Sequence, residues 1–268
     1  MTYQRINFEI QGNIAIIELN HPEVLNAVCE QMLNELKLAV LKVAEPNSGI
    51  RCLLLTGAGR GFCSGANLAD RKRRMDLESA SKKVDIPFFL DDTYNPLFLL
   101  LKELRMPIIT AIKGPAAGIG MTLSLMGDIV IASESAYFLQ AFRNVGLIPD
   151  GGITWLLPRL IGLARAMELS LLAERLPAQK ALEWGLINRV VPDNDLLPEA
   201  LKMAENLAAG PTQALALMRQ AYWKSFDNSH EQQLHLESLG QQQTASTEDA
   251  LEGGQAFLEK RKPVFKGK

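Results

Sequence analysis

Three short apolar runs, each followed by glycine or a polar turn, limit what this chain can fold into more than any other feature. They cover residues 51–57, 107–112 and 128–132, and none alternates regularly between apolar and polar positions. A strand with such a continuous apolar pattern is buried on both faces, as in a parallel sheet that helices cover. Helical segments separate the runs, so the order of elements predicts βαβ units and an α/β fold.

Flanking segments extend this predicted core. Residues 6–10 and 13–19 read as two strands joined by a Gly-Asn turn, which predicts a hairpin. Apolar side chains recur at helical spacing over residues 29–45. Beyond residue 155 the pattern predicts helices alone, with prolines at their boundaries.

Length and composition agree with an ordinary globular protein. The chain has 268 residues, of which 47% are hydrophobic and 22% charged, so it can bury a large core without disulfides or a metal. We expect a core over residues 1–195 and a helical C-terminal region over residues 196–268. The three cysteines form no metal-binding pattern, which favours a reduced, cytoplasmic protein.

Charge and hydropathy argue against several classes of function. The formal net charge is −2, and we interpret the basic cluster at residues 71–74 as a solvated helical face, so no nucleic-acid partner is expected. No apolar stretch reaches the ~20 residues of a membrane-spanning helix. The N-terminus opens directly into a strand pattern and does not resemble a secretory signal.

Two of the predicted strands end in loops of small residues. The loops cover residues 61–68 and 114–121. Glycine allows a sharp turn, and a pair of exposed N–H groups can stabilise the oxygen of a thioester as it becomes an enolate. A glycine that follows a strand is more often an ordinary turn, so composition alone does not assign this role.

The order of motifs along nearly the whole chain resembles the enoyl-CoA hydratase/isomerase, or crotonase, family. The matching segments are residues 51–68 (RCLLLTGAGRGFCSGANL), 113–128, 146–152, 181–186 and 252–261, together with His21-Pro22 and Leu25-Asn26-Ala27 near the N-terminus. The resemblance implies a crotonase fold, in which ββα units form a spiral core. It also implies that the C-terminal helices assemble homo-oligomers, either trimers or dimers of trimers.

Carried over by position, the resemblance implies an oxyanion hole made by the backbone N–H groups of Ala66 and Ile119. It further implies a binding site for an acyl-CoA substrate, formed by Leu25, Ala27, Ser64, Asn67, Leu68, Phe142, Phe257 and Lys260. For Phe257 and Lys260 a charged amphipathic helix explains the sequence equally well. CoA is part of the substrate, and neither a separate cofactor nor a metal is expected.

The chain departs from the hydratases of this family at both catalytic carboxylates. Hydratases use two glutamates to position and ionise water, whereas the corresponding positions here hold Thr122 and Phe142. A hydroxyl and a phenyl ring cannot supply that acid–base pair. One carboxylate remains, because Asp150 lies just after the proline of residues 148–152, where several isomerases of the family carry their acid. Asp150 could instead cap the following helix or fill a turn.

This pattern resembles most the enoyl-CoA isomerase branch of the phenylacetate pathway and predicts a Δ3–Δ2 enoyl-CoA isomerase or a related ring-opening isomerase. Asp150 would move a proton while the two N–H groups stabilise the dienolate, and an apolar pocket would raise the pKa of its carboxyl and exclude water. The alternatives are a hydratase, another CoA-thioester lyase or hydrolase, or a non-catalytic CoA-binding subunit. Residues 69–95 form a long polar segment that we interpret as a substrate lid, with a surface insertion as the alternative.

Overall fold

A six-stranded sheet forms the centre of this computed structural model, which describes residues 2–69 and 90–268. In spatial order the strands are β1 (Ile6–Gln11), β2 (Ile14–Leu19), β3 (Cys52–Gly57), β4 (Ile108–Ile112), β6 (Ile129–Ser133) and β9 (Arg189–Val191). β1 is antiparallel to β2, and the other neighbouring strands are parallel. The predicted hairpin and the three buried parallel strands are therefore confirmed.

The apolar runs are buried because a separate hydrophobic core covers each face of this sheet. Leu53 and Leu55 pack into the core that contains α1 (Glu30–Val43) and α4 (Asn95–Glu103). Cys52 and Leu54, which point the other way, pack into the core that contains α9. Successive strand residues face opposite sides of a sheet. A continuous apolar run is thus what burial on both sides requires.

Helix α9 (Leu196–Ala208) belongs with the sheet by its packing. Its buried face consists of Leu196, Ala200, Ala204 and Ala208, and small side chains on this face let the helix lie close to the strands. The predicted boundary at residue 195 therefore separates a helix from the sheet that it covers. By packing, the distinct helical region starts after Ala208.

A smaller sheet has the order β5 (Pro115–Ala117), β7 (Tyr137–Leu139) and β8 (Leu176–Pro177). β5 and β7 are parallel, and β8 joins β7 antiparallel. β8 and β9 show that the prediction of helices alone beyond residue 155 was wrong. These strands are two and three residues long, which is too short for any hydrophobic period, and their pairing depends on the strands that they join.

Short helices connect these layers. They are η1 (Pro22–Val24), η2 (Leu90–Tyr94), α5 (Ile119–Ser124), η3 (Ala141–Val145), α6 (Ile153–Ile161), α7 (Leu163–Leu172), α8 (Ala178–Glu183) and η4 (Asp193–Asp195). Most of the predicted lid over residues 69–95, and the basic cluster at 71–74, lie outside the described residues. The end of the lid segment forms η2, a single π-helical turn that leads directly into α4.

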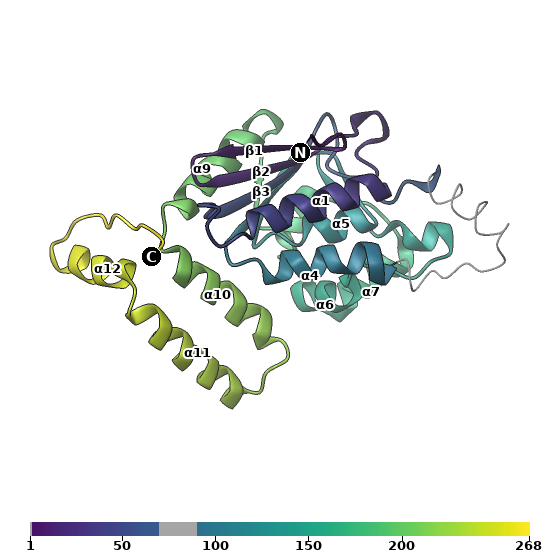
Figure 1. Ribbon diagram of the computed structural model, residues 1–268. Coiled ribbons are helices and arrows are strands. Elements are labelled where there is room, and N and C mark those ends of the chain that lie inside the picture. The colour runs from purple at the N-terminus through teal and green to yellow at the C-terminus, as the bar shows by residue number, and fades with distance from the viewer. Residues whose placement is uncertain (1, 70–89) are drawn as a thin grey trace.

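The last three helices form an arm that extends from the rest of the molecule (Figure 1). The C-terminal arm comprises α10 (Thr212–Ser225), α11 (His230–Ala245) and α12 (Glu248–Leu258). α10 is held by Arg219, whose Nε lies 2.8 Å from Asp128 Oδ1. Trp223 of α10 also stacks on Trp155 of α6, with ring centroids 5.9 Å apart. Helix α10 therefore anchors the arm to the core.

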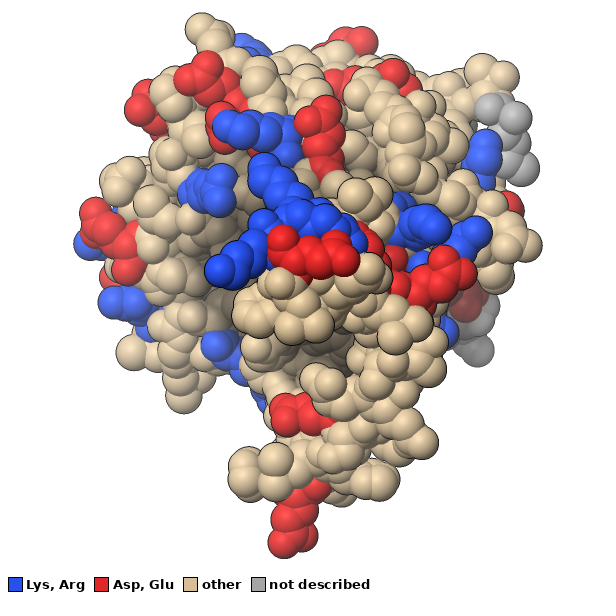
Figure 2. Space-filling model, turned by 90° about the vertical axis from the view of Figure 1, so that its left-hand side faces the viewer, with Lys and Arg blue, Asp and Glu red and all other residues tan. Residues whose placement is uncertain are grey.

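The end of the chain returns toward the core after α12. Asp249 accepts hydrogen bonds from the N–H groups of Lys266 and Gly267, and Arg51 donates to the carbonyl of Phe265. Figure 2 shows this face, where positively and negatively charged side chains lie next to one another. Between α12 and this last segment, Arg261 forms an ion pair with Glu252, with Nη1 and Oε1 2.6 Å apart.

No helix within residues 2–69 and 90–268 has both the length and the hydropathy needed to cross a membrane.

Candidate active site

The loop after β3 presents the first predicted donor, the N–H of Ala66. Val28 and Ala66 form an isolated parallel bridge, in which the Val28 N–H donates to Gly65 O and the Asn67 N–H donates to Val28 O, both at 2.8 Å. In such a bridge the flanking residues supply the hydrogen bonds, so the N–H of the central residue points away from the partner segment. The Ala66 N–H is accordingly directed away from Val28.

The second predicted donor, the N–H of Ile119, begins helix α5. The preceding residue, Gly118, has a φ of 51° and donates its own N–H to Leu139 O at 2.8 Å. Glycine adopts this left-handed conformation at little cost. Because Ile119 is the first helical residue, its N–H has no intrahelical acceptor. It is thus open to an acceptor from outside the helix.

The two loops that carry these donors are packed against each other. Cys63 and Ala116 form a parallel bridge, and a Cβ atom at Gly118 would lie 3.9 Å from Gly65 Cα. The approach is closest at Gly120, where a Cβ atom would lie only 2.5 Å from Cys63 O. No side chain larger than hydrogen fits there without moving the backbone. The loops that carry Ala66 and Ile119 are therefore in direct contact.

Asp150 lies beside the second loop and is half-buried. The Thr122 hydroxyl donates to the backbone carbonyl of Asp150 at 3.4 Å. The next residue, Gly151, is packed so closely that a Cβ atom there would lie 2.6 Å from Ile119 Cδ1 and 3.1 Å from Thr122 Cγ2. The structure thus brings together the remaining carboxylate, one vacated glutamate position and the second oxyanion loop.

Asp150 does not act as the N-cap of helix α6. Gly152 occupies the N-cap position, and within the described residues no side chain caps this helix end. The Asp150 backbone does take part in the turn, since its carbonyl accepts the Ile153 N–H at 3.4 Å. The turn therefore depends on the Asp150 backbone, and capping does not explain its carboxylate.

Aromatic rings enclose this part of the site. Phe142 is only 8% exposed, and its Cε2 and Cζ atoms lie 3.9 Å from where a Cβ atom of Gly118 would be. Phe98 of α4 contributes a second ring, with Cε2 3.0 Å from the corresponding point at Gly151. The sequence analysis missed Phe98 because an aromatic residue within an apolar helix is indistinguishable from a core residue. Phe142 thus places apolar surface beside the second oxyanion loop, and Phe98 places it beside the Asp150 turn.

Five of the predicted CoA-binding residues lie on the first oxyanion loop or on the N-terminal segment bonded to it, and they are Leu25, Ala27, Ser64, Asn67 and Leu68. The Ser64 N–H donates to Leu25 O, and the Ser64 hydroxyl donates to Val24 O, both at 2.9 Å. Asn67 and Leu68 follow Ala66 directly, and 54% of Leu68 is exposed. The predicted residue Ala27 is on the same N-terminal segment, next to the Val28 bridge. These residues therefore lie on two neighbouring segments at one edge of the candidate site.

The other two predicted CoA-binding residues lie elsewhere in the single chain. Phe257 is at the end of α12, 83% exposed, and Lys260 follows the helix with a left-handed φ of 56°. Figure 1 shows α12 at the far end of the C-terminal arm. Their predicted role is thus not supported by proximity within one protomer.

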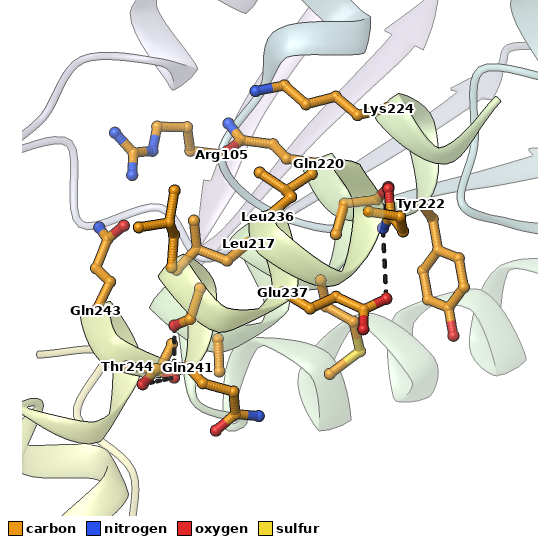
Figure 3. Close-up of a pocket in the computed structure, with 16 residues that line it drawn as sticks. Arg105, Leu217, Gln220, Tyr222, Lys224, Leu236, Glu237, Gln241, Gln243 and Thr244 are labelled. Carbon is orange, nitrogen blue, oxygen red and sulfur yellow. Dashed lines mark hydrogen bonds between the residues drawn. The ribbon is translucent and has the colours of Figure 1, made fainter. Parts of the chain in front are cut away.

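A pocket of about 640 Å³ lies in the C-terminal arm, between α10 and α11 (Figure 3). Its walls mix the apolar side chains of Leu217 and Leu236 with polar ones such as Gln220, Glu237 and Gln243. Neither oxyanion loop nor Asp150 contributes to it. It is the inner side of a helical hairpin and does not form part of the candidate active site.

Cysteine and metal chemistry have little support in the site. Cys63 lies in the first oxyanion loop, but burial raises the pKa of its thiol to about 12, so it remains neutral and unreactive near pH 7. Within the part of the chain that the structure describes, no three His, Cys, Asp or Glu side chains are grouped in a way that could hold a metal ion. Within the two oxyanion loops and residues 148–152, all of which the structure describes, Asp150 is the one carboxylate.

Comparison with known proteins identifies the family. The sequence profile of enoyl-CoA hydratase/isomerase matches residues 9–268. The chain belongs to this family. It is 45% identical to the 1,2-epoxyphenylacetyl-CoA isomerase of Escherichia coli (strain K12) over 259 residues, which cover 97% of each chain. It is 40% identical to a protein of Rhodobacter capsulatus named "Probable enoyl-CoA hydratase" over 268 residues, or 100% of both.

Solved structures agree with this assignment. The crystal structure of an enoyl-CoA hydratase from Bacillus anthracis has a TM-score of 0.90 and 33% identity, covering 99% of this chain and 100% of that one. The crotonase fold, the acyl-CoA enzyme class and the resemblance to the phenylacetate branch are therefore confirmed. Because the relatives carry both isomerase and hydratase names, they do not choose between these two reactions.

Proposed function

We propose that this enoyl-CoA hydratase/isomerase family member is an acyl-CoA double-bond isomerase with Asp150 as its single acid–base group. The main support is the arrangement around Asp150, whose backbone is bonded to Thr122, while Phe142 occupies the other position where hydratases carry glutamate. Hydration requires that a water molecule be held and ionised. Isomerisation only moves a proton, for which one carboxylate is sufficient.

The reaction starts with the thioester oxygen accepting hydrogen bonds from the N–H groups of Ala66 and Ile119. The Asp150 carboxylate removes a proton from C2 of a 3-enoyl thioester, and the electrons of that C–H bond form a dienolate with its charge on the thioester oxygen. The protonated Asp150 then returns the proton to C4, which leaves the double bond between C2 and C3. No atom is gained or lost in the overall reaction.

The backbone donors act mainly on the dienolate. They bind the oxygen more strongly as negative charge develops, so they lower the barrier and do more than bind the substrate. Each such donor contributes about 10²- to 10³-fold to the rate in enzymes of comparable design. Phe98 and Phe142 exclude water, which keeps the proton on Asp150 for return to C4 and leaves no nucleophile to add to C3 of the conjugated product.

A second candidate substrate class is a CoA thioester with a cyclic acyl group. The similarity to the Escherichia coli 1,2-epoxyphenylacetyl-CoA isomerase favours it, and the aromatic rings of Phe98 and Phe142 are suited to the packing of a cyclic acyl group. This is also an isomerisation of a CoA thioester, so it needs the same oxyanion hole. In both cases CoA is part of the substrate, and we propose no separate cofactor.

The test compares the wild type with Asp150→Asn on trans-3-enoyl-CoA, trans-2-enoyl-CoA and 1,2-epoxyphenylacetyl-CoA. Absorbance and product mass are recorded together. We expect conversion of the first or third substrate without gain of water, and a loss of about 10²- to 10⁴-fold in kcat in the variant. Hydration of the 2-enoyl substrate that survives the substitution would favour a hydratase. Thioester binding without any turnover would favour a non-catalytic CoA-binding subunit or another lyase or hydrolase substrate.

We also propose that the protein works as a homo-oligomer, either a trimer or a dimer of trimers. α11 is 16 residues long and none of its residues, all of which the structure describes, is buried. An isolated helix of this length is marginally stable and normally needs tertiary packing. Exposed Leu234 and Leu239, and the pocket against α10, offer apolar surface to another copy. Light scattering after gel filtration tests this, and a monomer at micromolar concentration would contradict it.

A further inference from the structure

The buried side-chain amide of Asn26 forms hydrogen bonds with three backbone groups around the first oxyanion loop. Asn26 is fully buried. Its Oδ1 accepts the His21 N–H at 2.7 Å, and its Nδ2 donates to Ala58 O at 2.9 Å and to Gly61 O at 2.8 Å. Both N–H bonds of the amide are thus used, and each reaches a different part of the turn that follows β3.

The backbone around Asn26 is held in an uncommon conformation. Leu25 and Asn26 both have left-handed φ values, 53° and 56°. Asparagine adopts this conformation more readily than most residues, whereas leucine rarely does. The Asn26 N–H also donates to His21 O at 2.9 Å, so Asn26 bonds to both the N–H and the carbonyl of His21. The side-chain amide therefore supports a strained turn.

This turn begins a series of hydrogen bonds between the N-terminal segment and the first oxyanion loop, and the series ends at Ala66. Asn26 binds Gly61, Leu25 O accepts the Ser64 N–H at 2.9 Å, and Val28 brackets Ala66 through two bonds of 2.8 Å. Along its other edge the same loop is bonded to residues 113–117, for example through the Cys63 N–H and Pro115 O at 2.9 Å. The loop is clamped between two segments, and Asn26 anchors the one nearer the N-terminus.

We propose that Asn26 is a positioning residue that sets the direction of the Ala66 N–H toward the thioester oxygen. The proposal rests on the proposed function, because Ala66 is an oxyanion donor only if a CoA thioester reacts there. Asn26 acts through Gly61 and Ala58, which hold the beginning of the loop against the N-terminal segment. A displacement of about 1 Å at such a donor is enough to lower a rate by about 10²-fold.

The chemistry of the amide explains why a carboxylate cannot replace it. In an Asn26→Asp variant the new side chain would have the same shape and would still accept the His21 N–H, but its second oxygen would face the carbonyls of Ala58 and Gly61. Two acceptors in contact repel each other, and the two buried carbonyls would lose their donor. Asn26→Gly removes the side chain altogether while tolerating the left-handed φ. The two variants therefore perturb the loop in different ways.

The experiment uses butanoyl-CoA labelled with ¹³C at its thioester carbonyl, which lacks the double bond that reacts. Isotope-edited infrared spectra of the bound probe report how strongly the N–H donors polarise the carbonyl, independently of any turnover. We expect the wild type to shift this band to lower frequency. Asn26→Asp and Asn26→Gly should lose at least half of the shift, with a roughly 10- to 100-fold lower kcat on the substrate that the wild type converts.

A matched control is Asn188→Asp, because the Asn188 Oδ1 also accepts a backbone N–H, that of Val130 at 2.8 Å, but at the β6–β9 edge of the sheet. It should leave the band and kcat unchanged. A full carbonyl shift in a folded Asn26→Gly variant would overturn the proposal, as would loss of probe binding itself, which would assign Asn26 to CoA binding. If the wild type bound the probe without any shift, the proposed oxyanion hole would be refuted and this inference with it.

Discussion

Replacement of Arg219 by methionine should destabilise the protein by about 3 kcal/mol, because it leaves a carboxylate without its cation. The Arg219 side chain is 4% exposed and that of Asp128 is 25% exposed. The guanidinium also donates to three carbonyls at the end of α4, those of Leu101, Lys102 and Leu104. Methionine keeps the apolar stem of arginine but satisfies none of these acceptors.

The magnitude follows from what remains after the substitution. Removing one partner of a buried ion pair costs about 3 to 5 kcal/mol. The lower end applies here, because Asp128 is partly solvated and keeps the hydrogen bond from the Ile108 N–H at 2.7 Å. Combining Arg219→Met with Asp128→Asn removes the uncompensated charge. The double variant should therefore recover about 1 kcal/mol or more relative to Arg219→Met alone.

Urea unfolding followed by circular dichroism, at one fixed protein concentration, measures these free energies. Fluorescence of Trp223, which stacks on Trp155 one turn beyond Arg219 on α10, reports whether the arm separates from the core first. A loss below about 1 kcal/mol in Arg219→Met, or a double variant less stable than the single one, would refute the reasoning. Either result would mean that the arm is held by its aromatic contacts and that the ion pair contributes little.

Three further predictions concern single residues. Gly120→Ala should displace the oxyanion loop, since its Cβ would lie 2.5 Å from Cys63 O, and lower kcat by about 10²-fold or more. Gly240→Ala in α11, where a Cβ atom would meet nothing within 4 Å, should instead stabilise the protein by up to about 1 kcal/mol; equal effects on activity would contradict this. Hydrogen bonds and charge from Arg261 lower the pKa of Glu252 to about 2, so the contribution of this pair is present above pH 4.5 and is lost as the pH falls toward 2; the protection of residues 259–268 from hydrogen exchange, relative to the intrinsic rate at each pH, should fall over that interval in the wild type and stay constant in Glu252→Gln. The Cys63 thiol, with its pKa raised to about 12, should resist alkylation by iodoacetamide at about pH 8 in the folded protein, and rapid labelling would show that the first oxyanion loop opens.

The absence of both hydratase glutamates removes the groups that would ionise water, but it leaves the proposed backbone donors in place. The donors at Ala66 and Ile119 depend on backbone bridges and on glycine, so they are independent of the side chains at positions 122 and 142. Thr122 has become part of the support of the Asp150 turn, and Phe142 closes the site with an apolar ring. In the proposed mechanism the same framework stabilises the enolate, and the remaining carboxylate moves the proton.

The amino-acid sequence alone was enough to predict the parallel sheet, the two loops of small residues and the absence of the hydratase carboxylates. These features are local. A strand buried on both faces must be continuously apolar, as residues 52–55 are, and a turn with positive φ selects glycine, as at Gly118. A missing functional group can likewise be read directly at its position in the chain.

Only the tertiary structure decided which distant segments meet. Thr122 is 28 residues from Asp150, and Asn26 is 35 residues from Gly61, yet each pair is joined by a hydrogen bond. The packing of α9 on the sheet and the two short strands after residue 155 are further examples. Such contacts depend on how whole layers of helices and strands fit together. The free energy of packing depends on the fit between two surfaces, whereas a local sequence pattern describes only one of them.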